Sequence, residues 1–484
     1  MEMTGAHPEE GEKVPRLVAF IVFVAVFMAV VDGSVVNIAL PTITTYFGVN
    51  VGLSQWVVTG YLVTMTSLLL IFGRISEYFG RGRVFTTGFL IFTLGSLACG
   101  LAPSLPALVF FRVIQAIGGA MLFSLSSAII YQLYPREELG KAMGYIGATV
   151  AIGSIAGPVL GGIIVDTLGW EYIFLINVPI GAVFVPLAMH YFRSMKFTRK
   201  EIRMDWAGAF FLVTFMVLLI LTMSELAENF ALTLPVLVTG GVFLAALAGF
   251  VVTQRRVRDP LLDLSIFRFL KFSLPVLATF LYFIALFMIN LVGPFYFEGV
   301  FGLPPSQVGL VFLIMPLVMV VGSPLAGWLH DNHYSPYYPM AGMVIAGTSM
   351  FVLAALALRM ELFLIIAVFF PMTIGSALFQ SPNNTEIMSA LPAEKVGIAS
   401  SISATVRNLG MALGASLGSI LLVVGTGLSG YSGPVLEANN EVLAFAAALI
   451  MGLSGVLAFV AGGVSFARAR LITKEQQRTP MAEQ

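Results

Sequence analysis

Charged residues, cysteines and histidines are all scarce in this sequence. Only 10% of the 484 residues are charged, whereas a soluble domain usually has about 25%. The formal net charge is zero, which removes the case for nucleic-acid binding. Cys99 is the single cysteine, so no internal disulfide can form, and we expect it to be a buried thiol. His330 and His333 are spaced for one helix face but lack further Cys or His ligands, so we expect no metal and no cofactor.

Apolar residues, in contrast, are abundant and make up 58% of the chain. Single hydrophobic cores stop growing at about 250–300 residues, so this much apolar surface cannot be buried in one core. It must face lipid, and the lipid bilayer is therefore an expected partner. The N-terminal stretch MEMTGAHPEEGEKVPR is polar and acidic, and the apolar run after it is too long for the core of a signal peptide. We predict an all-α polytopic membrane protein.

Fourteen segments are long and apolar enough to span a bilayer, which takes about 20 residues. The expected helices cover 16–40, 52–73, 84–102, 106–133, 141–165, 171–191, 206–224, 232–252, 272–297, 306–329, 338–358, 361–386, 397–424 and 441–466.

The basic residues test this layout. Of the 25 Lys and Arg residues, 22 fall in the tails or in the loops on the same side as the tails. Arg359 alone falls on the other side, and Arg112 and Arg407 fall within helices. Because loops rich in Lys and Arg stay in the cytoplasm, this bias predicts that both termini are cytoplasmic. A missed or added helix would scramble the alternation, so the count also supports fourteen spans.

A weak internal repeat suggests how the helices are organised. GRISEYFGRGR (73–83) follows the second expected helix and GWLHDN (327–332) follows the tenth, and both begin Gly-x-[Ile/Leu]-x-[Glu/Asp]. Repeated six-helix halves around a midplane site are a known transporter architecture. We therefore expect an N-terminal tail, a six-helix bundle, an inserted helix pair with basic linkers, a second six-helix bundle and a C-terminal tail, at 1–15, 16–192, 193–271, 272–466 and 467–484.

Five motifs occur in the order found in one transporter family. They are Asp32-Gly-Ser-Val-Val-Asn37-Ile-Ala-Leu-Pro41, the loop containing Gly73, Glu77, Gly80 and Arg81, the helical Arg112-x-x-Gln115-Ala-x-Gly118, the run Gly153-x-x-x-Gly157-Pro158-x-x-Gly161-Gly162, and WEYIFLINVPIG (170–181). Across nearly its whole length, the chain resembles the major facilitator superfamily, and within it the fourteen-helix drug:proton antiporter family (DHA2-like multidrug efflux transporters).

The resemblance implies roles for several residues. Gly73, Glu77, Gly80, Arg81 and the second-half Asp331 would form the gating motif that holds the cytoplasmic side shut. Glu77 stands where the family usually has Asp, and Tyr78 where it has Arg, so the latch is expected to be weaker or differently paired. In WEYIFLINVPIG, Glu171 replaces an Arg. The run from Gly153 to Gly162 would be the antiporter motif, in which small residues four apart allow close helix packing and Pro158 allows a kink.

Asp32 and Arg112 are predicted to lie at similar depth in the membrane. Asp32 is about eight residues, roughly 12 Å, short of the expected outer end of its helix. Arg112 is about six residues, roughly 9 Å, below the outer start of its own. A charge at the midplane costs about 2.5–3.5 kcal/mol, and an opposite charge can offset this cost. Our hypothesis is that Asp32 carries the proton and Arg112 tunes it. The alternative is a permanent ion pair that only pins two helices together.

Other embedded side chains are candidates for coupling or binding. Glu386, near the expected cytoplasmic end of its helix and within reach of water, is a second proton or cation site. Glu225, Glu228 and Glu298 are expected at solvated outer helix ends, and Arg407 could be structural or functional. The residues expected to contact substrate are Asp32, Asn37, Gln55, Gln115, Phe283, Met288, Asn290, Phe379, Gln380 and Asn384.

The leading functional prediction is proton-coupled export of amphipathic, often cationic, drugs by alternating access. No Gly-x-x-x-x-Gly-Lys-[Ser/Thr] motif occurs, so a gradient must supply the energy. The alternative is a dedicated exporter of one metabolite, antibiotic or lipid-like compound. A membrane enzyme or sensor is a remote third possibility, because neither a catalytic cluster nor a signalling domain is apparent. We expect a monomer in the cytoplasmic membrane of a prokaryote, and no enzymatic activity.

Overall fold

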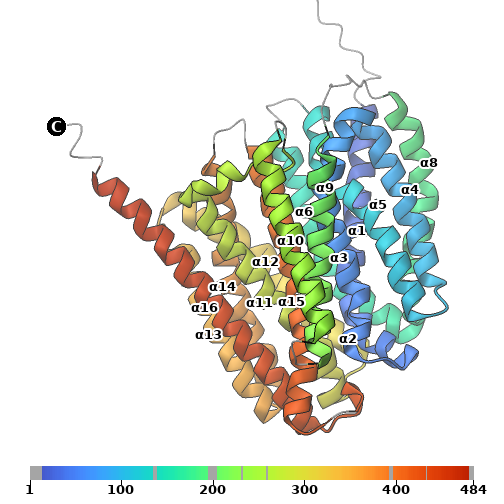
Figure 1. Ribbon diagram of the computed structural model, residues 1–484, viewed down its shortest axis with the longest axis vertical. Helices are drawn as coiled ribbons and strands as arrows, with labels where there is room; N and C mark the ends of the chain where they lie inside the picture. Colours follow the sequence, from blue (N-terminus) through green and yellow to red (C-terminus); the bar gives the residue numbers. More distant parts are fainter. Residues whose placement is uncertain are drawn as a thin grey trace, which may run out of the picture.

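The molecule is a bundle of long helices that run roughly parallel to one another (Figure 1). The computed structural model describes residues 13–134, 139–194, 204–229, 233–257, 260–391, 396–431 and 433–478. Residues 1–12 and 479–484 of the expected tails, and 195–203 and 258–259 of the expected basic linkers, lie outside the described residues. Within the described ranges, fourteen helices are long and apolar enough to cross a membrane, which confirms that prediction.

The helices are listed here in chain order. The elements before residue 195 are α1 (Lys13–Phe47), α2 (Val51–Ser54), α3 (Trp56–Phe79), α4 (Arg81–Gly100), α5 (Leu105–Leu133), α6 (Leu139–Thr167), α7 (Tyr172–Leu175), α8 (Asn177–Tyr191) and η1 (Phe192–Ser194). The later elements are α9 (Trp206–Asn229), α10 (Leu234–Arg256), η2 (Leu264–Arg268), α11 (Leu270–Phe301), α12 (Pro305–Asn332), α13 (Tyr338–Arg359), α14 (Leu362–Ser389), α15 (Val396–Leu428), η4 (Val435–Glu437) and α16 (Asn440–Arg478).

Local sequence explains where several helices begin and turn. The side chains of Asn50 and Ser104 accept backbone N–H bonds from Leu53 and Ala107, and so cap α2 and α5. Gly80 joins α3 to α4 with φ at 97°, a conformation that any other residue would adopt only with strain.

Several helices are longer than predicted. The first ends at Phe47 rather than at residue 40, because Pro41 is accommodated inside it. Prolines are tolerated in membrane helices, where neighbouring groups satisfy the freed carbonyl. Asp32 therefore lies halfway along the span Arg16–Phe47, nearer the middle of its helix than expected. At the other end of the chain, α16 continues to Arg478, through much of the segment expected to be a tail.

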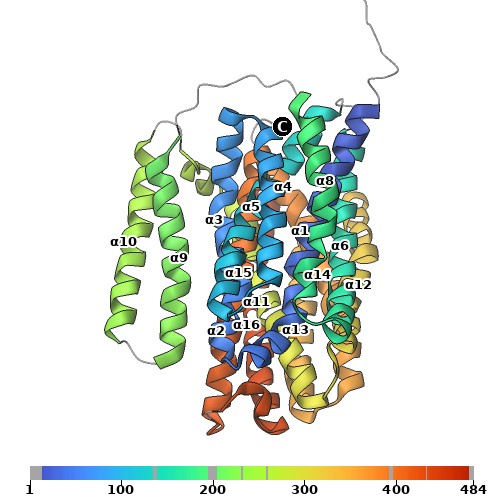
Figure 2. The ribbon, with the colours of Figure 1, turned by 90° about the vertical axis from the view of Figure 1, so that its right-hand side faces the viewer.

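Packing contacts group the spans. Before residue 192, α1 packs on α6, and α5 packs on both α3 and α4. After residue 270, α11 packs on α15 and α16, and α13 packs on α14 and α16. Two extensive contacts join these groups, α6 with α12 and α3 with α15. The hairpin of α9 and α10 stands at one edge, where α9 reaches both α3 and α15 (Figure 2).

The contact between α6 and α12 is closest at the end of the molecule away from the N-terminus. Gly162 faces the backbone of Pro305 and Ser306, and Gly309 faces the backbone carbonyl of Pro158. A Cβ on Gly162 would lie 2.9 Å from Ser306 Cα, too close for real side chains. Glycine is thus what lets the two groups of helices meet here.

Candidate functional site

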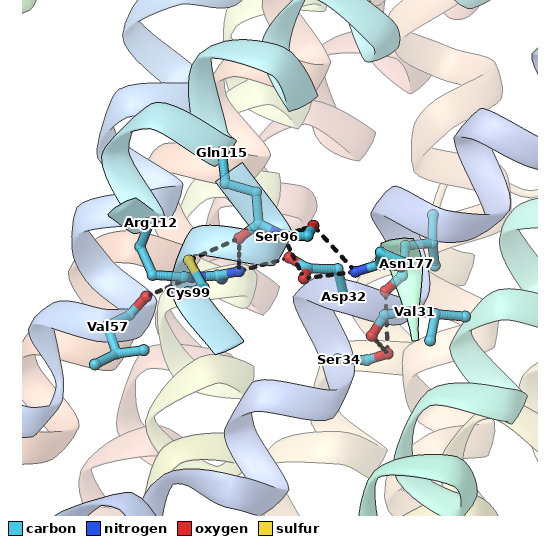
Figure 3. Close-up of polar contacts among 10 residues, drawn as sticks. Val31, Asp32, Ser34, Val57, Ser96, Cys99, Arg112, Gln115 and Asn177 are labelled. Atoms are coloured by element: carbon cyan, nitrogen blue, oxygen red, sulfur yellow. Dashed lines mark hydrogen bonds and ion pairs between the residues drawn. The ribbon is translucent and has the colours of Figure 1, made fainter. Parts of the chain in front are cut away.

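Asp32 is the centre of a buried polar network (Figure 3). Its side chain is 1% exposed, as is that of Arg112. Arg112 Nη1 donates to Asp32 Oδ2 at 2.6 Å, and Gln115 Nε2 donates to Asp32 Oδ1 at 2.8 Å. Asn177 Nδ2, from α8, lies 3.4 Å from the same Oδ1. Three donors from two other helices therefore satisfy both oxygens of the carboxylate.

The guanidinium of Arg112 has partners on every side. Its Nε donates to the Val57 carbonyl of α3 at 3.1 Å, and its Nη1 also donates to Gln115 Oε1 at 2.7 Å. The Tyr61 ring centroid lies 4.0 Å from Cζ, which adds a cation–π attraction in a desolvated site. Asp32 and Arg112, which were predicted to lie at similar depth, are thus in direct contact.

Gln115 joins this ion pair to α4. Its Nε2 donates to Ser96 Oγ at 2.7 Å, and its Oε1 receives a weak contact from Cys99 Sγ at 3.7 Å. Cys99 is a buried free thiol, as expected. Every member of the network lies before residue 192, so it links helices of one group and does not cross to the other.

This arrangement limits the chemistry available to Asp32. Asp32 and Arg112 are both buried and hydrogen-bonded, so the ion pair is held in place. Water has almost no access to it. Proton exchange at Asp32 would require a rearrangement that opens the network. The assignment of Asp32 as a proton carrier stays a prediction, and so does the alternative of a static pair.

The predicted antiporter motif lies directly against the helix that carries Asp32. A Cβ on Gly153 would be 3.0 Å from Val30 Cγ1, and one on Gly161 would be 3.1 Å from Val35 Cγ1. A Cβ on Gly157 would overlap Ser34 Oγ. The adjacent Pro158 and Gly162 face α12 instead. One stretch of α6 therefore touches both the Asp32 helix and the opposite group of helices.

Three of the predicted binding residues lie around Tyr282 in the second group. Phe283 and Phe379 belong to one buried apolar cluster with Tyr282, and the Tyr282 and Phe379 ring centroids are 5.1 Å apart. Gln380 Nε2 donates to the Tyr282 hydroxyl at 3.0 Å. Their proposed contact with substrate stays a prediction.

The remaining predicted binding residues are dispersed. Met288 is fully buried in the main core. Asn290 donates to the Leu286 carbonyl of its own helix at 3.0 Å, and Asn384 is exposed on α14. Asn37 is 8% exposed, and Gln55 is 1% exposed and lines a cavity between the end of α1 and the end of α15. No described contact brings these side chains to Asp32.

Glu386 lies near the end of α14, as expected, but the expectation that it reaches water is wrong. It is 3% exposed and forms an ion pair with Arg468 of α16. Its assignment as a second proton or cation site stays a prediction. Arg468 was counted with the cytoplasmic charges, but α16 continues past it and buries it. Glu298 likewise lies inside α11 and is partly buried, because that helix ends at Phe301 rather than at residue 297.

The predicted gating motif makes its described contacts within the first group of helices. Arg81 Nη1 donates to the Ala128 carbonyl of α5 at 3.0 Å. Glu77 lies 3.8 Å from Arg74, one turn away on the same helix. Asp331 is exposed near the end of α12. A latch between the two groups stays a prediction.

Sequence reasoning missed three members of the Asp32 network and one partner of Glu386. Asn177 was present in the quoted motif WEYIFLINVPIG but was given no role. Ser96 and Tyr61 carry no distinguishing local signal, because Ser and Tyr are common in apolar helices. Arg468 was missed because its helix was ended too early.

Comparisons with known proteins agree with this fold. A model of the Major Facilitator Superfamily matches residues 22–415. The chain is 33% identical to the riboflavin transporter RibZ of Clostridioides difficile, over 82% of this chain and 86% of that protein. It is 32% identical to the multidrug resistance protein Stp of Mycobacterium tuberculosis, over 82% of this chain and 74% of that protein. An inward-facing bacterial homologue of the lysosomal transporter Spinster shares its fold, with a TM-score of 0.67, 16% identity, and coverage of 97% of this chain and 99% of that one. The chain therefore belongs to the major facilitator superfamily, as a multi-pass membrane transporter rather than an enzyme, with bacterial relatives consistent with the cytoplasmic membrane.

Proposed function

We propose that this transporter exports amphipathic, cationic drugs in exchange for protons, as a DHA2-like antiporter. The observation that carries the proposal is the Asp32–Arg112–Gln115 network, which holds a carboxylate at the middle of a span, sealed from water. Buried ion pairs are poor stabilisers, so a chain that only needed stability would do as well with apolar residues. The relative named as a multidrug resistance protein supports the choice of drugs as substrates.

In the proposed cycle, the halves 16–192 and 272–466 rock against each other, with both termini in the cytoplasm. Asp32 exchanges its proton when this movement opens the network. The glycines of α6 provide the mechanical link, because they contact α1 beside Asp32 on one face and α12 on the other. Through α6, a change in the charge of Asp32 alters the packing between α6 and α12, where the halves meet. The inserted pair α9 and α10 is not assigned a part in this movement.

The test is transport by the purified chain in proteoliposomes with an imposed pH gradient, which supplies about 1.4 kcal/mol per pH unit for each proton. Ethidium, a fluorescent cation, is the probe. We expect the gradient to drive ethidium transport by the wild type and not by Asp32→Asn. Glu361→Gln is the matched control, because Glu361 is an exposed acid at a helix end. Unchanged coupling in Asp32→Asn would overturn the carrier role.

A dedicated exporter is the second candidate, favoured by the similarity to a protein named as a riboflavin transporter. Riboflavin is neutral, so the same vesicles distinguish the two proposals. Gradient-driven transport of riboflavin without ethidium would select the dedicated exporter. Transport of ethidium and of other unrelated cations would select multidrug efflux.

A further inference from the structure

Two aromatic rings lie close to the guanidinium of Arg112. The ring centroid of Tyr61, on α3, is 4.0 Å from Arg112 Cζ, and that of Phe174, on α7, is 5.4 Å from the same atom. Both distances are within the limit of about 6 Å for a cation–π attraction. Tyr61 is 2% exposed and Phe174 is 0% exposed, so water does not weaken the attraction. The rings therefore compensate the positive charge of Arg112 in addition to Asp32.

The hydroxyl of Tyr61 does not account for this side chain. Among the described residues, no group forms a hydrogen bond with Tyr61 Oη, although this atom is buried. Buried hydroxyls are normally paired, because an unpaired one is costly. The favourable contacts of Tyr61 are therefore those of its ring.

The helix that carries Arg112 also makes room for the Tyr61 ring. Gly119 follows Arg112 on α5 by seven positions, which is about two turns, so the two residues lie on the same face. A Cβ on Gly119 would lie 2.9 Å from Tyr61 Oη. Any other residue at position 119 would therefore press against the side chain that covers Arg112.

The rings matter most when Asp32 is neutral. While Asp32 is ionised, its carboxylate compensates Arg112 directly at 2.6 Å. When Asp32 takes up a proton, Arg112 stays positive, because a guanidinium does not lose its proton in proteins. Its other described hydrogen-bond acceptors, the Val57 carbonyl and Gln115 Oε1, are uncharged. A buried charge without a counter-charge is costly, and the ring faces offset part of this cost in either state of Asp32.

We propose that Tyr61, assisted by Phe174, is a positioning residue that holds Arg112 in place while Asp32 is protonated. The inference rests on the proposed function, because it concerns the state in which Asp32 carries the proton. Tyr61 acts through Arg112 and does not exchange the proton itself. Without the ring, Arg112 would turn away from a neutral Asp32, and the ion pair would not re-form in the same place.

A double-mutant cycle in thermal unfolding tests this role without any transport. Asp32→Asn represents the protonated acid, because it has nearly the same shape and no charge. Tyr61→Phe keeps the ring and Tyr61→Leu removes it, so the difference between their melting temperatures measures the effect of the ring. We expect this difference to be about twice as large in the Asp32→Asn chain as in the chain with Asp32. The cost of a smaller side chain is common to both chains and cancels in the comparison.

Phe89→Leu is the matched control for loss of a buried ring. Phe89 is 0% exposed on α4, and its described ring contact is with Phe85 rather than with an arginine. This variant should lower the melting temperature equally in the two chains. Phe174→Leu should show a smaller excess than Tyr61→Leu, because its ring is farther from Arg112. If Tyr61→Leu does not fold, the cycle with Phe174→Leu decides the matter.

Transport per folded molecule gives a readout that lost stability alone would not change. In the proteoliposome assay, Tyr61→Phe should transport ethidium at nearly the wild-type rate, and Tyr61→Leu should be about tenfold slower. Gly119→Ala should slow transport in the wild type but not in Tyr61→Phe, which lacks the hydroxyl that the added methyl would meet.

The inference is overturned if the ring has the same effect on the melting temperature in both chains, or if Tyr61→Phe loses transport as fully as Tyr61→Leu. Failure of the proposed function would look different, since it would appear as unchanged proton coupling in Asp32→Asn. The unfolding cycle still decides in that case whether the ring holds Arg112, because it requires no proton transport.

Discussion

Among the described residues, each group of helices contains one buried acid paired with arginine, but the two sites are built differently. Asp32 receives hydrogen bonds from Arg112 and Gln115, and Asn177 lies 3.4 Å away. Glu386 contacts Arg468 at ion-pair distance, and no other described residue hydrogen-bonds to its carboxylate. Both acids are at most 3% exposed. The two sites thus differ in hydrogen bonding and not in burial.

This difference bears on how each site responds to a lost charge. A buried carboxylate that keeps several donors is still partly compensated when its arginine is removed. A carboxylate held by one partner is left uncompensated, which costs several kcal/mol. The Asp32 site is therefore suited to holding a charge while its surroundings rearrange. The Glu386 site depends on a single contact between α14 and α16.

The largest expected effect is at Arg468. Arg468→Met should destabilise the chain by about 3–5 kcal/mol, because Glu386 is left as an unpaired buried charge. Thermal unfolding in detergent measures this as a lower melting temperature. Adding Glu386→Leu should restore most of the loss, since a well-packed apolar pair replaces a buried ion pair at little cost. A double variant as unstable as the single one would contradict the account.

Arg112→Met sharpens the contrast. Asp32 keeps Gln115 and Asn177 as donors, so the loss of stability should be smaller than for Arg468→Met, at about 2–3 kcal/mol. Proton-coupled transport should nevertheless fall far more than in Arg468→Met. If the two variants lose stability equally, the extra hydrogen bonds around Asp32 do not compensate its charge, and the comparison fails.

The contrast could be foreseen only in part from sequence. Periodic apolar runs and the alternation of basic loops were enough to place fourteen spans, and matching depth brought Asp32 to Arg112. The helix ends could not be placed, because Pro41 and the polar stretch after residue 466 look like terminators when neighbours are unknown. This error hid the burial of Arg468 and, with it, the partner of Glu386.

The smaller members of the site were beyond sequence reasoning for another reason. Ser96 contacts Gln115 only because α4 packs on α5, and that choice of neighbours is a tertiary property. Gln55 and Ser419 line the same cavity although they are separated by 364 positions along the chain and belong to different groups of helices. Gln55 could be named as an embedded polar residue, but the cavity could not.

Gln115→Leu tests whether the network around Asp32 acts as a unit. It removes donors to Asp32 and Ser96 and an acceptor for Arg112. Each partner left unpaired costs about 1–3 kcal/mol, reduced where another bond remains. We expect a net loss of about 2 kcal/mol in thermal unfolding. Gln380→Leu is the matched control in the second group, where only the bond to Tyr282 is lost, and it should cost less.

Gly162→Ala tests the contact that joins the two groups. Its added methyl would meet the Pro305 backbone, which cannot rotate away as a side chain can. Overpacking of this kind costs about 1–3 kcal/mol. We expect slower transport in proteoliposomes, because the ends of α6 and α12 that meet here are held apart. Gly463→Ala is the control, since nothing lies within 4 Å of its added Cβ.

The smallest effect on stability is expected at Glu77 and Arg74, because this ion pair is exposed, unlike those of Asp32 and Glu386. Their charged groups are 3.8 Å apart, and their side chains are 30% and 37% exposed. Exposed pairs contribute about 0–1 kcal/mol, because water already solvates both charges. Glu77→Gln should therefore leave the melting temperature within about a degree or two of wild type. Transport measured in parallel separates stability from gating, since a large loss of transport at unchanged stability would support a gating role for Glu77.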